Sequence, residues 1–142
     1  RPADRRVALV NTLGIPFIVH GRSEGLDFDY PFTDIDNEGA FHEAARLLVQ
    51  LGHRRLALIN GDGRETFAIH RERGVRRALA ASGLVLDEGD VCSLAMTEEN
   101  GYRAARRLIE RSDAPTAIAC SSLIMALGVV RAVRDLGLTI PG

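Results

Sequence analysis

The feature that most restricts the fold is an alternation of short apolar runs with longer amphipathic segments. The runs "RRLALING" (54–61) and "TAIAC" (116–120) are typical of buried strands, and each precedes a segment with helical periodicity, about 66–81 and 123–136. Because parallel strands are joined by crossovers that usually contain a helix, this order predicts an α/β fold with a doubly wound parallel sheet. Such sheets bind ligands beyond the carboxyl ends of their strands. The junctions expected there follow Gly21, Gly61, Leu94 and Cys120.

Length and charge narrow the class of protein. The chain has 142 residues, the size of one ordinary domain, and a net charge of −1. No apolar run approaches the roughly 18 residues of a membrane span, so we expect no membrane partner. A nearly neutral chain has no overall attraction for nucleic acid, which means that another segment would have to read DNA. Cys92 and Cys120 match neither a C-x-x-C pair nor a zinc spacing, which indicates reduced thiols and a cytoplasmic protein.

The first quarter of the chain has weaker patterns. A helix is predicted over about 4–13 and a strand over 15–21, followed by a polar loop over 22–34. Gly25 and Pro31 argue against regular structure in that loop.

A long amphipathic helix is predicted from Asn37 to about Gln50, and Gly52 ends it. Its apolar residues recur at the spacing of one helix face. The residues expected on its buried face are Ala40, Ala44, Leu47, Leu48 and Leu51.

Motifs of known catalytic chemistry are weak in this chain. "GDGRET" begins like a nucleotide-binding loop, but Thr66 stands where the third glycine is needed, so a plain turn is the better interpretation. Ser121 and Ser122 precede a predicted helix without the G-x-S-x-G pattern of a hydrolase, and we interpret them as helix caps. The four histidines are scattered and give no metal-ligand spacing. We therefore expect no enzyme, no cofactor and no metal.

Two other features indicate ligand binding near the strand ends. Asp34 and Asp36 are two residues apart in an extended segment, so their carboxylates share a face and suit either carboxylate chemistry or ligand binding. Arg71 falls near the start of a helix, on the side that faces the strand ends. A guanidinium there would hold a hydroxyl-rich or carboxylate ligand by paired hydrogen bonds. The rest of the run "HRERGVRR" is typical of a solvated helix face.

Several ordered motifs resemble one family. They are "DIDNEGAFHEAARLLVQLGHRRLALING", "RERGVRRAL", "NGYRAARRLI" and "PTAIACSSLIMALGVVRAVRDLGLTIP", and together they cover about Pro16 to Pro141. The chain resembles the effector-binding core of the LacI/GalR transcriptional regulators. The resemblance implies a fold like that of periplasmic binding proteins, with two α/β subdomains and a small ligand between them. Residues 1–33 would be the tail of the N-terminal subdomain and residues 34–142 most of the C-terminal subdomain, with the helix-turn-helix outside this chain.

The resemblance also implies roles for individual residues. Arg71 matches the arginine that holds the effector, and Ser122 matches a polar position that bonds it. Met96 falls where an aromatic ring often stacks on the ligand, and Phe67 lies on a neighbouring cleft loop. Leu123 departs from the family pattern, because an aspartate commonly follows the polar residue.

The helix after Ser122 is apolar on more than one face. In the family that the chain resembles, this helix lies at the dimer contact of the C-terminal subdomain, which implies a homodimer. One face would pack inward and another would meet the partner. The inward candidates are Ile124, Leu127 and Val130, and the candidates for the dimer interface are Met125, Leu127, Val129 and Val133.

The expected function is therefore that of a sensor domain in a bacterial transcriptional repressor or activator. A small effector, expected to be a sugar, would bind between the subdomains and alter operator binding through the missing helix-turn-helix. A periplasmic sugar-binding protein of a transporter is the alternative, since it would share the fold. An enzyme on a similar sheet is a third hypothesis.

Overall fold

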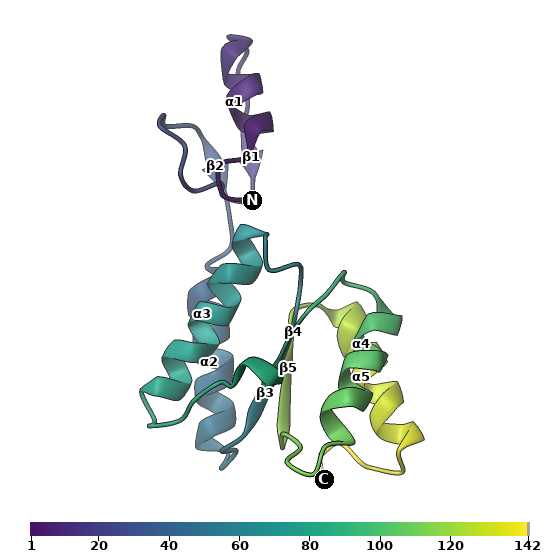
Figure 1. The fold of residues 1–142 in the computed structure, drawn as a ribbon. Helices are drawn as coiled ribbons and strands as arrows, with labels where there is room; N and C mark the ends of the chain where they lie inside the picture. Colours follow the sequence, from purple (N-terminus) through teal and green to yellow (C-terminus); the bar gives the residue numbers. More distant parts are fainter. Residues whose placement is uncertain (142) are drawn as a thin grey trace.

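A computed structural model describes residues 1–141, and Figure 1 shows their fold. The N-terminal segment holds α1 (Arg5–Thr12), β1 (Val19–His20) and β2 (Phe32–Thr33). There follow α2 (Asn37–Gln50), β3 (Leu56–Asn60), α3 (Thr66–Ala80), a 3-10 turn (Glu88–Asp90), β4 (Val91–Ser93), α4 (Glu98–Ile109), β5 (Ala117–Cys120) and α5 (Leu123–Asp135). Within residues 1–141, every helix is too short or too polar to cross a membrane.

Strands β3, β4 and β5 form a parallel sheet in the order β4-β3-β5. Leu58 of β3 pairs with Val91 on one side and with Ala119 on the other. Helices α2 and α3 lie on one side of the sheet, and α4 and α5 lie on the opposite side (Figure 1). The predicted α/β class with a doubly wound parallel sheet is confirmed.

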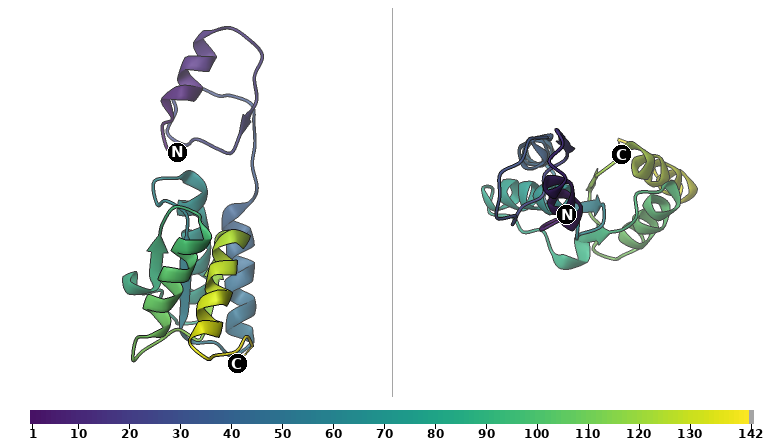
Figure 2. Two further views of the ribbon diagram at one scale, coloured as in Figure 1. Left: turned by 90° about the vertical axis from the view of Figure 1, so that its right-hand side faces the viewer. Right: turned by 90° about the horizontal axis from the view of Figure 1, so that it is seen from above.

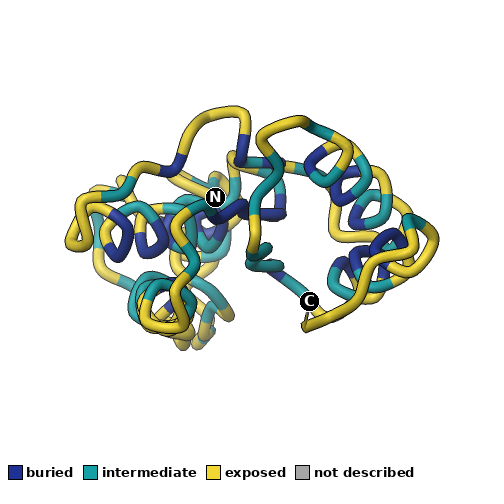
Figure 3. The backbone as a smooth tube through the Cα atoms, turned by 90° about the horizontal axis from the view of Figure 1, so that it is seen from below, coloured by how far each residue is buried: buried dark blue, intermediate teal, exposed yellow. Residues whose placement is uncertain are grey.

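The side chains of β3 alternate between two hydrophobic cores, and all of them are buried. Leu56 and Leu58 pack with α2 and α3, whereas Ala57 and Ile59 pack with α4 and α5. Figure 3 shows the consequence for the helices, whose buried positions turn inward while their exposed positions turn to solvent. A strand covered on both faces needs apolar residues at every position, which explains the unbroken run in the sequence.

The predicted strand over 15–21 is reduced to β1, and the predicted loop contains its partner β2. Val19 pairs with Phe32 in a small parallel sheet. Pro31 does not prevent this pairing, because the ladder uses its carbonyl oxygen, which accepts the Val19 amide at 3.0 Å. The missing N–H of proline is therefore not needed. The helix predicted over 4–13 is confirmed as α1, and the Asp4 side chain caps it.

The predicted buried face of α2 is largely wrong. Ala40, Ala44, Leu47 and Leu51 are exposed, and of the expected set Leu48 packs against the core. Ala45 is fully buried instead. The cause is the close approach of α3, because Gly74 lies directly against the backbone of Glu38 and His42. That contact fixes which side of α2 faces inward.

The structure also corrects the dimer-facing residues of α5. Met125 is fully buried, and Val129 and Val133 are each 7% exposed in the core shared with α4. Their side chains pack inside this chain's own core, so the prediction that they meet a partner is wrong. Gly128 causes this orientation, because it lies against the backbone of Glu98 in α4. Leu127 is 52% exposed and remains a candidate for the dimer interface.

Candidate functional site

The carboxyl ends of β3 and β5 meet at a buried polar cluster. Asn60, the last residue of β3, is fully buried, and its Nδ2 donates to the Ala68 carbonyl at 2.8 Å. Its Oδ1 accepts from the Gly61 amide at 2.9 Å and from the Ser121 hydroxyl at 3.0 Å. Ser121 Oγ also accepts the Gly61 amide at 3.1 Å. These bonds hold the turn after β3 against the turn after β5.

Arg71 reaches this cluster from α3. Its Nε donates to Asn37 Oδ1 at 2.8 Å, and its Nη1 donates to the carbonyl and hydroxyl oxygens of Ser121 at 2.7 and 3.3 Å. A guanidinium has five N–H donors. Within residues 1–141, these contacts engage Nε and Nη1, and the two donors on Nη2 have no protein acceptor. Burial lowers the pKa of Arg71 from its usual value, and the Asp34 carboxylate partly offsets that effect.

Aromatic rings and a thioether complete this side of the site. The guanidinium carbon of Arg71 lies 4.8 Å from the Phe67 ring centre and 5.1 Å from that of Phe41. A Cβ on Gly61 would lie 2.8 Å from the Phe67 ring and 3.6 Å from Met96 Sδ, so both side chains border this glycine. The structure therefore brings three of the predicted effector residues together: Arg71, Phe67 and Met96.

Asp34 and Asp36, in the short segment between β2 and α2, have different positions. Asp36 Oδ1 accepts the Gly39 amide at 2.8 Å and caps α2. Its carboxylate does not line the pocket described below, whereas Asp34 does. An effector contact of Asp36 stays a prediction, and Asp34 is the carboxylate of the two that lines the pocket.

Ser122, for which the resemblance implied an effector contact, is the cap of α5, and its contact with an effector stays a prediction. Leu123, which departs from the family pattern, is the first residue of that helix. Ser122 Oγ accepts the Met125 amide at 3.4 Å and caps α5. The serine that contacts Arg71 is Ser121. Leu123 is 78% exposed on the first turn of α5, so it adds apolar surface there.

The N-terminal segment lies beyond these strand ends, as the left view of Figure 2 shows. Arg1 Nε lies 2.6 Å from Glu65 Oε1 just before α3. His70 of α3 is 3% exposed and contacts the same segment, with Nε2 2.9 Å from Glu24 Oε1. A pocket of about 470 Å³ lies along this contact. Its walls include Val7, His20, Asp34 and Phe67, so both parts of the chain line it.

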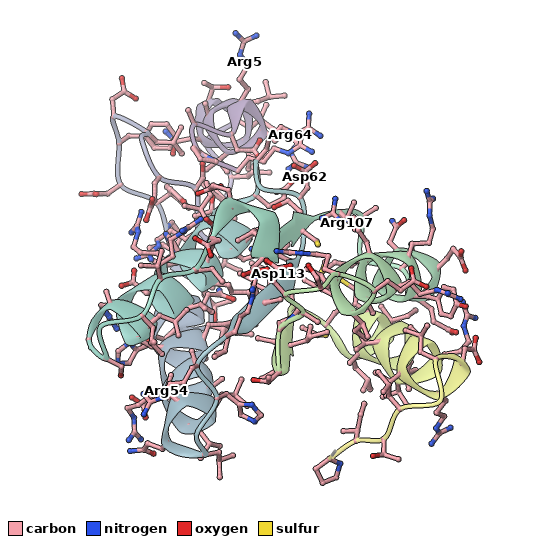
Figure 4. The ribbon with its side chains drawn as sticks, turned by 60° about the horizontal axis from the view of Figure 1, so that its bottom comes forward. Arg5, Arg54, Asp62, Arg64, Arg107 and Asp113 are labelled. Carbon is pink, nitrogen blue, oxygen red and sulfur yellow. The ribbon has the colours of Figure 1, made fainter. Side chains whose placement is uncertain are left out.

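The geometry of these side chains does not support a catalytic role for them. Burial raises the pKa of the Cys120 thiol to about 11, which keeps it protonated at neutral pH. Within residues 1–141, no three histidine, cysteine or acidic side chains gather as metal ligands. The loop of "GDGRET" is a local turn in which Asp62 accepts the Arg64 amide at 3.0 Å, and Figure 4 shows these two side chains together. The arrangement suits binding of a polar ligand.

Sequence reasoning missed three residues of this cluster: Asn37, Phe41 and Asn60. Asn60 could have been found, because it ends a buried strand at the edge where ligands bind. Phe41 and Asn37 gave no such signal, since their contacts with Arg71 depend on how α2 packs against α3.

Comparisons with known proteins agree with this architecture. A family model described as a periplasmic binding protein-like domain matches residues 45–142. The chain is 54% identical over 140 residues to the HTH-type transcriptional regulator AglR of Rhizobium meliloti, and 32% identical over 134 residues to the HTH-type transcriptional regulator CelR of Thermobifida fusca. These matches cover 99% and 94% of this chain and 39% of each relative, so the chain spans about two fifths of their length.

Solved structures give the same result. A LacI-family regulatory protein from Chloroflexus aggregans superposes with a TM-score of 0.90 and 30% identity, over 97% of this chain and 50% of that one. A complex of the transcriptional regulator CelR with cellobiose superposes with a TM-score of 0.87 and 31% identity, over 97% of this chain and 42% of that one.

Proposed function

Since the chain belongs to the periplasmic-binding-protein-like domains of the LacI family of transcriptional regulators, we propose that it is the ligand-sensing part of a DNA-binding regulator. A helix-turn-helix elsewhere in the protein would read the operator, as the HTH-type names of the relatives suggest. Residues 1–33 would belong to one effector subdomain and residues 34–142 to the other. Such a regulator would act in the cytoplasm, where its operator lies.

The observation that carries this proposal is the hydrogen bonding of the Arg71 guanidinium. Three contacts to Asn37 and Ser121 hold its guanidinium in place, while the Nη2 donors have no protein acceptor in the described chain. The Asp34 carboxylate is near enough to act on the pKa of Arg71 and lines the pocket together with Phe67, whose ring lies 4.8 Å from the Arg71 guanidinium carbon. A ligand that reached both groups would find donors on Arg71 and acceptors on Asp34. Preorganisation of this kind lowers the entropy lost when a ligand binds.

We propose a sugar as the effector. Sugars present hydroxyl groups that both donate and accept hydrogen bonds, together with apolar ring faces. Arg71 and Asp34 supply the polar partners, and Phe67 and Met96 supply apolar surface next to them. The complex of the similar regulator CelR with cellobiose supports this ligand class.

The regulator would act as a homodimer through α5. Leu123, Ile124 and Leu127 are exposed on this helix at 78%, 48% and 52%, and this set is called the α5 patch below. Large apolar side chains gathered on one helix face are typical of a protein contact. Effector binding would favour one arrangement of the subdomains, and the dimer would pass that change to the DNA-binding heads.

The other two hypotheses have less support. The named relatives are transcriptional regulators, which favours the regulator over a solute-binding protein of a transporter. We propose a binding role rather than a catalytic one, since the site holds a thiol with a raised pKa and serines engaged in capping and in the polar cluster.

A thermal-shift screen of the full-length regulator tests the ligand class. Wild-type protein is screened against mono- and disaccharides, including cellobiose, and against purine bases. We expect at least one sugar to raise the melting temperature, because a ligand that binds the folded state stabilises it. Stabilisation by purines alone would contradict the proposal.

A further inference from the structure

The contacts of Arg71 continue into the crossover segment (34–36) that joins the N-terminal part to α2. Asn37, the first residue of α2, is 4% exposed and is bonded through both ends of its amide. Oδ1 accepts from Arg71 Nε at 2.8 Å, and Nδ2 donates to the Ile35 carbonyl at 3.0 Å and to Asp34 Oδ1 at 3.3 Å. Arginine has donors only, so this contact fixes the amide with its oxygen toward Arg71.

We propose that Asn37 is a positioning residue, which holds Arg71 in its effector-binding orientation and links it to the crossover segment. This inference rests on the proposed function. Asn37 is buried behind the arginine and its amide is engaged on both sides, so its effect on a ligand passes through Arg71.

The helix itself does not require this side chain. The α2 cap is Asp36, whose Oδ1 accepts the Gly39 amide at 2.8 Å. Asn37 is thus free of the capping role that asparagine often has near a helix start. What its amide connects is Arg71 on one side and Asp34 on the other.

Removal of the Asn37 acceptor would loosen Arg71 in a specific way. Ser121 would still accept from Nη1, but the guanidinium could rotate about that end. Because a long arginine side chain has many rotamers, a ligand on Nη2 would then have to order it on binding. The link also has a reciprocal consequence: a ligand that fixes Arg71 favours the crossover conformation that keeps Asn37 in place.

Three variants separate these contacts. Asn37→Ala removes the bonds on both sides. Asn37→Asp keeps an acceptor for Arg71 Nε but loses both donors to the crossover segment. Asn100→Ala is the matched control for the exchange of Arg71, since Asn100 lies in the first turn of α4 and its Nδ2 donates to the Ala95 carbonyl at 2.9 Å, a bond that does not involve Arg71.

The first readout needs no effector. The full-length regulator is labelled with ¹⁵N-arginine, the Nε–H signal of Arg71 is assigned by its loss in Arg71→Lys, and its hydrogen exchange is measured by NMR. We expect exchange about tenfold faster in Asn37→Ala, from the loss of one hydrogen bond to a charged group. Asn100→Ala should exchange like the wild type, and Asn37→Asp, which keeps an acceptor for Nε, should exchange more slowly than Asn37→Ala. Unchanged exchange in Asn37→Ala would overturn the inference.

The second readout is calorimetric titration with cellobiose and with any other sugar that stabilises the wild type. Affinity should fall about tenfold in Asn37→Ala and fall less in Asn37→Asp, which keeps the acceptor for Arg71 Nε. Fast exchange of Arg71 together with unchanged sugar affinity would refute the positioning role. If no sugar binds the wild type, the proposed effector class fails, while the exchange experiment still decides whether Asn37 holds Arg71.

Discussion

Gly128 of α5 lies directly against the main-chain carbonyl of Glu98 in α4, at a place where a Cβ would overlap the carbonyl oxygen. Gly101 of α4 lies in the same way against the Met125 carbonyl of α5. Two glycines thus let the helices touch backbone to backbone. This contact sets the rotation of α5, which buries Met125 and leaves Leu127 exposed.

Gly128→Ala should therefore destabilise the fold. The added methyl group would force α4 and α5 apart, at a cost of about 3 kcal/mol in the free energy of unfolding. Gly63→Ala is the control, because a Cβ there would meet Ser93 at an ordinary 3.5 Å and its cost should stay within about 0.5 kcal/mol. Urea denaturation of the full-length regulator measures both. Equal stability of the two variants would refute the close contact.

The α5 patch predicts how the protein assembles. Leu127→Glu should weaken the dimer at least about tenfold, since it places a charge in an apolar contact. Leu47→Glu on α2 is a matched control, because Leu47 is 54% exposed and Leu127 52%. Sedimentation velocity at micromolar concentration distinguishes the two. Wild-type assembly in Leu127→Glu, or equal weakening in both variants, would show that α5 is not the contact.

Asp113 gives a prediction for acid stability. Hydrogen bonds from Arg111 and Arg55 lower its pKa to about 2, below the value of about 3.9 for an unfolded chain. A depressed pKa in the folded state contributes stability at higher pH, and that contribution is lost as the pH falls through about 4 to about 2. The free energy of unfolding of wild type and Asp113→Asn should differ above pH ~4 and converge below it. Because Asp113 is half exposed, salt should reduce the difference.

A difference between wild type and Asp113→Asn that stays constant from neutral pH to about pH 2 would contradict this assignment. Figure 4 shows where the residue lies, near the middle of the molecule in that view.

The sequence predicted the sheet correctly because β3 carries its own signal. Its residues are apolar except for Asn60 at its end. All five are buried, because helices cover both faces of the strand. The short β1 gave a misleading signal, since Ile15 and Ile18 belong to an apolar run yet are exposed at 55% and 68%. Periodicity reports apolar residues, but the neighbours of a segment decide which of them pair or pack.

The orientation of α2 and α5 could not be predicted for a related reason. Each helix has apolar residues on two faces, so a period of 3.6 fits either one. The deciding contacts are made by Gly74 and Gly128, which admit the backbone of a neighbouring helix. In the site, Arg71 was identifiable from its place near a helix start. Its partner Asn37 was not, because the contact joins residues 34 positions apart.

The central claim is that Arg71 holds the effector, and calorimetric titration tests it most directly. The full-length wild type, Arg71→Ala and Arg77→Ala are titrated with the sugar that most stabilises the wild type. Arg77 is the control, since it lies on the same helix and pairs with Glu38 at 2.7 Å. Arg71→Ala should bind at least about tenfold more weakly, and Arg77→Ala should bind like the wild type. Wild-type affinity in Arg71→Ala would contradict the account.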